Sequence, residues 1–185
     1  LLSYLIGSRN YKRVLVFVRK KELVDKLRDE LTSSGLHAVS IHGDMKSGAR
    51  AKSLAQFKSK KARVLVATDI TARGIDIPEL EVVINYDIPH VKSDYIHRIG
   101  RTGRAGNDGL AITLISPDEY LSLKDLERVL GKAIPKEYLD GYAPEKSEKV
   151  QKGARSPNKQ KLKTAGAFGK KKKPDRSSKK RKTTK

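Results

Sequence analysis

The segment VLVFVRKKELVDKLRDELTSSGLHAVSI, from Val14 to Ile41, carries the strongest structural signal in the chain. Its first five residues are a continuous apolar run rich in valine, which is typical of a strand buried on both faces. Apolar residues then recur at helical spacing: Leu23, Val24, Leu27 and Leu31. Gly35 can end this helix in the left-handed conformation, and AVSI follows as a second apolar run. The succession predicts a βαβ unit with two parallel strands.

The alternation of strand and helix patterns continues as far as Ile115. Three more β-rich runs are predicted as strands: Val64 to Ala67, Val82 to Asn85 and Leu110 to Ile115. A helical pattern begins at Ser47, with Ala51, Leu54, Ala55 and Phe57 predicted inward and Lys52, Lys58 and Lys60 outward. A last helix is predicted from about Asp118 to Gly131. These patterns predict an α/β domain with a mainly parallel sheet and helices on both faces.

Charge is distributed unevenly along the 185 residues, whose formal net charge is +20. Residues 1–144 contain 24 basic and 18 acidic side chains, a balance of +6, whereas residues 145–185 contain 17 basic and 3 acidic ones, a balance of +14. Residues 1–144 suffice for one domain with its own core. Residues 145–185 have too few apolar groups to offset the entropy lost on folding, so we predict a disordered basic tail.

Several functional classes are excluded by what the sequence lacks. The chain has no cysteine, which removes disulfides, thiolate zinc sites and cysteine nucleophiles. The four histidines, His37, His42, His90 and His97, are dispersed and predict no metal site. No apolar run has the roughly 18–20 residues of a membrane span, so no membrane partner is expected. The chain has no GxxxxGKS or GxxxxGKT phosphate loop and begins at Leu1, so we expect half of an active site from a longer protein.

Three loops have compositions that suggest a ligand. They are IHGDMKSGAR (Ile41–Arg50), ATDITARGIDI (Ala67–Ile77) and HRIGRTGRAG (His97–Gly106). Each follows a predicted strand or opens near a helix end. Ligands of open parallel sheets bind outside the carboxyl ends of the strands, where such connections meet. We therefore predict that the three loops converge although they are far apart in sequence.

HRIGRTGR is the most informative of the three. Arg98, Arg101 and Arg104 recur every three residues, which keeps them on one side of a helical or tightly turned backbone. Three guanidiniums repel one another unless an anion joins them, and the intervening Gly100 and Gly103 let the backbone approach a bulky ligand. The segment predicts a polyphosphate partner. The alternative is a solvated basic turn paired with nearby carboxylates.

ATDITARGIDI contains polar residues directly after a predicted strand. The hydroxyl of Thr68 beside exposed backbone amides predicts a phosphate-binding site. Asp76 is suited to accept hydrogen bonds from ribose hydroxyls. In the alternative, Thr68 caps the next turn and Asp76 pairs with Arg73.

IHGDMKSGAR offers His42 and Gly43 at a strand end and Arg50 on the following helix. His42 is either a general base or a structural histidine, and the sequence names no partner that would make it a base.

Together the three loops resemble motifs of the DEAD-box RNA helicases of superfamily 2, in the second RecA-like domain of that family. HRIGRTGR is similar to motif VI, ATDITARGIDI to motif V, VLVFV to motif IV and IHGDMKSGAR to the segment after it. The resemblance spans about Val14 to Leu130 and includes NYDIP, from Asn85 to Pro89. The opening His-Arg of motif VI favours the DEAD-box branch over DEAH or RecQ-type helicases. The exit IPKEYLDGYAPE is similar to the bacterial RhlE-like subgroup.

The resemblance implies a role for each matching residue. Arg101 and Arg104 match the arginine fingers that reach toward the γ-phosphate of ATP, and Asp76 matches the ribose contact. Contacts to RNA are implied for six residues: Arg50, Thr68, Arg73, Gly74, His42 and Gly43. Coupling between the two helicase domains is implied for His97, Arg98 and Asp69. Ser47 stands where the family usually has Gln, which implies a weaker RNA contact at that position.

The resemblance also implies the partners. ATP and Mg²⁺ would be bound mainly by a first RecA-like domain, which carries the phosphate loop and the DEAD carboxylates. This chain alone is therefore expected to be inactive, and the longer protein is expected to unwind short RNA duplexes by closing two domains over ATP and single-stranded RNA. A cytoplasmic protein is expected, or a nuclear or nucleolar one if the source is eukaryotic.

Alternatives stay open for the tail and for the whole chain. The basic tail is expected to tether RNA through phosphate contacts, and otherwise acts as a solubilising or nuclear-targeting segment. The chain itself is alternatively a stand-alone, non-catalytic RNA-binding or RNA-chaperone module. A DNA translocase of the same superfamily is disfavoured by the residues of motif VI.

Overall fold

A computed structural model describes residues 1–75, 77, 80–103 and 108–142, so the predicted tail of residues 145–185 lies outside the described part. Five strands form one parallel sheet: β1 (Val14–Phe17), β2 (Ala38–Ile41), β3 (Val64–Ala67), β4 (Val82–Asn85) and β5 (Leu110–Thr113). The strand order is β2-β3-β1-β4-β5, which places β1 at the centre. All five predicted strands are confirmed, although β1 and β5 end slightly earlier than predicted.

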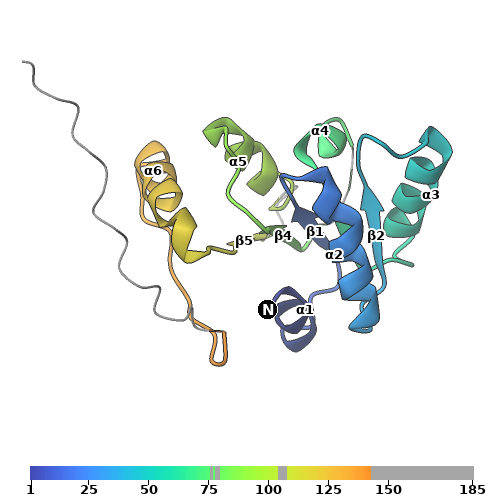
Figure 1. The fold of residues 1–185 in the computed structure, drawn as a ribbon, viewed down its shortest axis with the longest axis horizontal. Coiled ribbons are helices and arrows are strands. Elements are labelled where there is room, and N and C mark those ends of the chain that lie inside the picture. Colours follow the sequence, from blue (N-terminus) through green and yellow to red (C-terminus); the bar gives the residue numbers. More distant parts are fainter. Residues whose placement is uncertain (76, 78–79, 104–107, 143–185) are drawn as a thin grey trace, which may run out of the picture. The chain divides into compact units, whose positions relative to one another are not determined.

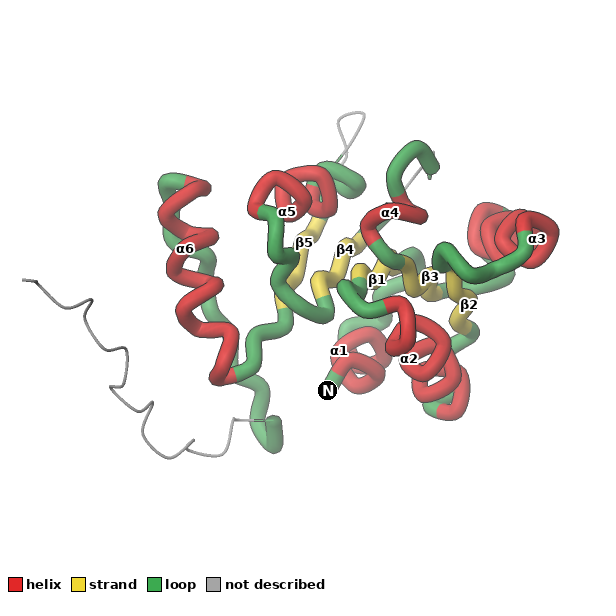
Figure 2. Tube along the Cα trace, turned by 45° about the horizontal axis from the view of Figure 1, so that its top comes forward, coloured by secondary structure: helices red, strands yellow, loops and turns green. Residues whose placement is uncertain are grey.

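Helices cover both faces of this sheet. They are α1 (Leu2–Ser8), α2 (Lys21–Ser33), α3 (Ser47–Lys58), α4 (Asp69–Ala72), α5 (Lys92–Ile99) and α6 (Tyr120–Leu130), with a 3-10 turn, η1 (Pro117–Glu119), before α6. Figures 1 and 2 show α1 and α2 on one face, and α3, α4 and α5 on the other. The three-layer arrangement predicted from the alternating patterns is therefore confirmed.

Side chains of the central strand, β1, pack into the hydrophobic clusters on both faces of the sheet. Val14 and Val16 pack with α1 and α2 in one buried cluster, whereas Leu15 and Phe17 belong to a second cluster with α3 and α4. This alternation follows from the pleat, which points successive side chains to opposite faces. Because both faces are buried, every position of β1 has to be apolar, and the strand appears in the sequence as a continuous apolar run.

A third cluster joins α6 to α5. It contains Ile88, Tyr95, Leu123 and Leu126, all buried. Before α6, the side chains of Ser116 and Glu119 form a reciprocal capping box at η1. The last helix therefore supports α5, which carries His97 and Arg98 of the candidate site.

The sequence patterns do not predict α1, α4 or α5. For α3 they predict two side chains to face the sheet that are exposed instead. Ala51 and Ala55 are exposed, so the prediction that they face inward is wrong, whereas Phe57 is fully buried and Leu54 is partly buried. A single methyl group gains little from burial, so the alanines do not determine how α3 is rotated on the sheet.

Candidate nucleotide and nucleic-acid interface

The predicted loops lie at one edge of the sheet, at the carboxyl ends of the strands. Thr68 and Asp69 directly follow β3, and Asp87 lies two residues after β4. The chain leaves β1 toward β2 but leaves β4 toward β5, so the connections diverge from the middle of the sheet. In open α/β sheets, ligands bind where the connections diverge in this way.

Direct contacts join all three loops. The Thr71 hydroxyl donates to the backbone carbonyl of Ile41 at 3.1 Å, which links the loop after β3 to the loop after β2. The guanidinium of Arg98 on α5 donates to both carboxylate oxygens of Asp69, at 2.6 and 2.7 Å. The prediction that the loops converge is therefore confirmed.

Arg98 is the structural centre of this region. Its side chain is only 1% exposed and lies over the Phe17 ring, with 5.2 Å between the guanidinium carbon and the ring centroid. Besides its two bonds to Asp69, it donates through Nη1 to the Asn85 side-chain oxygen at 3.2 Å and to the Asp87 carbonyl at 2.8 Å. Arg98 thus has carboxylate partners in its own chain, Asp69 and, at 3.8 Å, Asp87. That Arg98, Arg101 and Arg104 share one anion stays a prediction, because Arg104 lies outside the described residues.

Asp87 connects the ends of β1 and β4. Its two carboxylate oxygens each accept the backbone N–H of Arg19 at 3.1 Å, and the Arg19 guanidinium lies 3.5 Å from both Asp87 and Glu119. Burial raises the pKa of Asp87, although the hydrogen bond from the Arg19 amide and the charges of Arg19 and Arg98 act in the opposite direction. The sequence gives no sign of this network, because its members lie far apart along the chain.

A small pocket lies between α4 and α5. Its lining residues are Phe17, Asp69, Ala72, Arg73, Asp94, His97, Arg98 and Arg101. Arg101 follows the end of α5 and donates through Nη1 to the Ile75 carbonyl at 3.2 Å. Arg73 pairs with Asp94, and His97, which is largely exposed, has its Nδ1 atom 3.9 Å from the same carboxylate. The pocket therefore places two cationic side chains, Arg73 and Arg101, beside the pair of partly buried Asp69 and buried Arg98.

Two glycines of the loops adopt backbone conformations that other residues rarely accept. Gly74 has φ +75° and Gly103 has φ +66°, both in the left-handed region. Gly74 lets the chain turn directly after Arg73, and Gly103 lets it turn directly after Thr102, two residues beyond Arg101. These glycines are therefore required by the shape of the loops, independently of any approach to a ligand.

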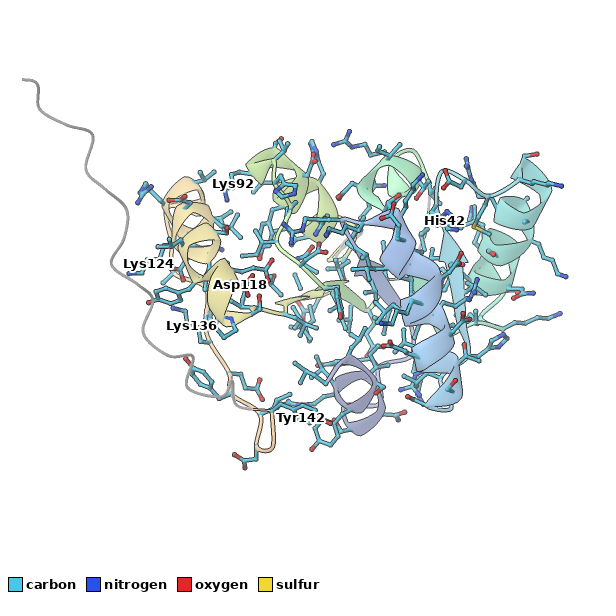
Figure 3. The ribbon with its side chains drawn as sticks, in the orientation of Figure 1. His42, Lys92, Asp118, Lys124, Lys136 and Tyr142 are labelled. Atoms are coloured by element: carbon cyan, nitrogen blue, oxygen red, sulfur yellow. The ribbon has the colours of Figure 1, made fainter. Side chains whose placement is uncertain are left out.

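The loop after β2 is held by α2. Nε2 of His42 lies 3.0 Å from Oδ2 of Asp25 on α2, and His42 is 12% exposed (Figure 3). The alternative of a structural histidine therefore describes the His42 ring better than a general base. Arg50 on α3 donates to the backbone carbonyls of His42 and Gly43, both at 3.4 Å.

Thr68 occupies the N-cap position of α4 without a side-chain bond to a helix N–H. Its hydroxyl oxygen lies 2.9 Å from that of Thr71 instead, so the predicted capping bond is absent from this described turn. Arg104 and Asp76 lie outside the described residues, and with them the alternative pairing of Asp76 with Arg73. Asn85, Asp87, Arg19 and Asp25 belong to the site's networks but were given no role by the sequence patterns.

Within residues 1–75, 77, 80–103 and 108–142, no group of three or more histidine or acidic side chains is arranged to hold a metal ion. None of the described helices is long and apolar enough to cross a membrane.

Comparison with known proteins identifies the family. The family described as helicase conserved C-terminal domain matches residues 1–106. The chain belongs to this helicase family. The matched residues include all three loops described above, from Ile41 to Gly106.

The curated relatives that the chain matches are RNA helicases. The ATP-dependent rRNA helicase RRP3 of Candida glabrata is 42% identical to the helicase domain over 139 residues, which cover 75% of this chain and 28% of that protein. The ATP-dependent RNA helicase RhlB of Pseudomonas syringae pv. tomato is 42% identical over 134 residues, which cover 72% of this chain and 34% of that protein. The chain thus spans about a third of the length of these relatives.

Solved structures agree with this assignment. The E. coli DEAD-box protein SrmB, solved bound to regulator of ribonuclease activity A, has a TM-score of 0.73 and 38% identity, covering 77% of this chain and 84% of that chain. A DEAD box protein from Methanococcus jannaschii has a TM-score of 0.69 and 42% identity, covering 74% and 38%. The helicase domain therefore has the RecA-like fold of DEAD-box C-terminal domains. Its predicted place in the RhlE-like subgroup stays a prediction, since relatives of similar identity come from yeasts and bacteria.

Proposed function

We propose that this chain is the C-terminal half of an ATP-dependent RNA helicase that unwinds short RNA duplexes. The observation that carries the proposal is the joining of three loops at the carboxyl edge of the sheet, where Asp69 pairs with the buried Arg98. That pair fixes α5, and the end of α5 presents Arg101 at the pocket shared with α4. A rigid, positively charged edge of this kind is suited to meet phosphates of a ligand held by a second domain.

The residues that match the family motifs receive the following roles in this proposal. Arg101 and Arg104 would supply positive charge to the γ-phosphate of ATP, and Asp76 would hold the ribose. The RNA backbone would be contacted by Arg50, Thr68, Arg73, Gly74, His42 and Gly43, with Ser47 contributing less than the family's usual Gln. His97, Arg98 and Asp69 would couple closure of the two domains to the bound ligands.

The proposal assigns the remaining chemistry to another part of a longer protein. ATP and Mg²⁺ would be held mainly by an N-terminal RecA-like domain in the same chain, and Mg²⁺ would neutralise charge that develops on the phosphates. RNA, single-stranded or in short duplexes, would be read through its phosphates and sugars with little sequence preference. A cytoplasmic location, nuclear or nucleolar in a eukaryote, completes the proposal.

The first experiment compares ATP hydrolysis by the full-length gene product with that by these 185 residues, each with and without RNA. We expect RNA-stimulated turnover only in the longer protein, because the described residues contain no phosphate loop. Stimulation by a DNA oligomer equal to that by RNA would favour the DNA translocase alternative. If the 185-residue chain is the whole native protein and anneals RNA without ATP, the stand-alone RNA-binding module becomes the better explanation.

Removal of residues 145–185 is expected to weaken RNA binding and to flatten its salt dependence. These residues have a formal charge of +14, and each phosphate neutralised on a single strand contributes about −0.7 to the slope of log affinity against log salt. Fluorescence anisotropy with a labelled single-stranded RNA, repeated at several salt concentrations, measures both quantities. Equal slopes with and without residues 145–185 would show that the tail does not contact the nucleic acid.

A further inference from the structure

We infer that Asp25 is a positioning residue, which holds the loop after β2 in place and, through that loop, the guanidinium of Arg50. Asp25 lies in the middle of α2, outside the three loops that carry the family motifs. The inference rests on the proposed function, since it concerns how the RNA-facing edge is built. It extends that function to a side chain that does not itself contact the ligand.

The first step of the argument is the contact between α2 and β2. One carboxylate oxygen of Asp25 accepts the Ser40 hydroxyl at 2.7 Å and Nη1 of Arg28 at 2.7 Å. The other oxygen lies 3.0 Å from Nε2 of His42. Burial acts to raise the pKa of Asp25, but the hydrogen bond from Ser40 and the charges of Arg28 and His42 outweigh it and lower that pKa. Asp25 is therefore ionised near neutral pH and available as an acceptor on both oxygens.

The second step concerns the His42 ring. An ionised carboxylate only accepts hydrogen bonds, so Nε2 of His42 has to carry the proton. Nδ1 of the same ring is buried and has no hydrogen-bond partner in the described part of the chain. Asp25 is thus the group that fixes both the tautomer and the orientation of His42.

The third step leads from His42 to Arg50. Nη2 of Arg50 donates to the backbone carbonyls of His42 and Gly43, at 3.4 Å each. A second, exposed contact holds the same loop, because Nζ of Lys21 at the start of α2 lies 2.8 Å from Asp44. Nε of Arg50 is buried without a partner among the described residues. The guanidinium thus depends on the loop carbonyls for its position.

The test compares three variants of the 185-residue chain: Asp25→Ala, Asp25→Asn and the control Glu30→Gln. Glu30 is an exposed residue of α2 whose carboxylate pairs with Lys26, so the control removes the same charge from the same helix without touching the loop. The first readout needs no RNA. In Asp25→Ala, the NMR resonances of the His42 ring nitrogens and of the backbone amides of residues 43–46 are expected to shift, because the tautomer is no longer fixed. Asp25→Asn, which keeps an oxygen acceptor, should restore part of the native resonances.

The second readout is affinity for an oligouridine of about 10 nucleotides. Removing a negative charge should on general electrostatic grounds raise affinity for RNA, and this is the result expected for Glu30→Gln. Asp25→Ala is expected to lower affinity about 3- to 10-fold instead, since one positioning contact is lost. In an Arg50→Ala background the same substitution should cost clearly less affinity, because the part of its effect that acts through the Arg50 guanidinium is gone.

Unchanged loop resonances in Asp25→Ala would overturn the inference whether or not the chain binds RNA. Unchanged or raised RNA affinity of Asp25→Ala would also overturn it. So would an equal loss of RNA affinity on Asp25→Ala in the parent chain and in the Arg50→Ala background. Absence of RNA binding by the unsubstituted chain would count against the proposed function itself, and the loop resonances would still decide whether Asp25 positions the loop.

Discussion

Replacing Arg101 by alanine in the full-length protein is expected to lower RNA-stimulated ATP hydrolysis by about 100-fold or more. Arginines that meet the γ-phosphate stabilise charge that develops in the transition state, and losing one such donor removes several kcal/mol of stabilisation. Arg101 is suited to this role because the buried Arg98 one turn before it fixes the end of α5. Steady-state turnover at saturating ATP and RNA measures the effect.

Two controls separate this loss from unfolding or from a general loss of charge. Arg128→Ala removes an exposed arginine of α6, which pairs only locally with Asp125, and should leave turnover unchanged. RNA affinity of Arg101→Ala should stay near that of the parent protein, because the residue is assigned to the nucleotide and not to RNA. Normal turnover in Arg101→Ala would remove the arginine-finger role from the proposal.

The second large effect is on stability. Asp69→Ala is expected to lower the free energy of unfolding by about 3–5 kcal/mol, because it leaves the guanidinium of Arg98 buried without its bidentate carboxylate. For a domain of this size the melting temperature should fall by about 10–15 °C. Urea denaturation followed by circular dichroism gives the free energy directly. Asp125→Ala, which breaks an exposed pair on α6, should change it by less than about 0.5 kcal/mol.

A double variant distinguishes an uncompensated charge from lost packing. Asp69→Ala combined with Arg98→Met replaces the partly buried ion pair by apolar groups, and such replacements often recover much of the stability lost by removing one partner. We therefore expect the double variant to unfold at a higher urea concentration than Asp69→Ala alone. If the two losses simply add, Arg98 is held by packing on Phe17 more than by its charge partner.

The accuracy of the sequence predictions follows the range of the interactions involved. The strands were predictable because burial on both faces requires an unbroken apolar run, as in β1 and β3. α2 was predictable because Val24, Leu27 and Leu31 form one buried stripe. α4 spans only four residues, too few for any periodicity, and α5 is mostly polar. α1 does carry a helical spacing, Leu2, Leu5 and Ile6, and this signal could have been found.

At the site, the loops that carry the motifs were predictable from the sequence. The ion pairs and hydrogen bonds that their side chains form were not. The spacing of Arg98, Arg101 and Arg104 suggests three equivalent phosphate ligands. Arg98 differs because Asp69, 29 residues earlier, reaches it across the sheet edge. Similarly, Asp25 lies 17 residues before His42, and Arg73 pairs with Asp94, 21 residues later. Pairings of this kind depend on the tertiary fold, which local spacing does not encode.

The order of the strands also affects how the domain forms during synthesis. β1 leaves the ribosome first among the strands, yet both of its neighbours in the sheet, β3 and β4, come later, and β4 ends only at Asn85. β1 and β2, although consecutive, do not pair with each other because β3 lies between them. The hydrophobic centre of the domain therefore stays incomplete until β4 has been made, and distant pairings of this kind fold slowly and expose aggregation-prone surface in the meantime.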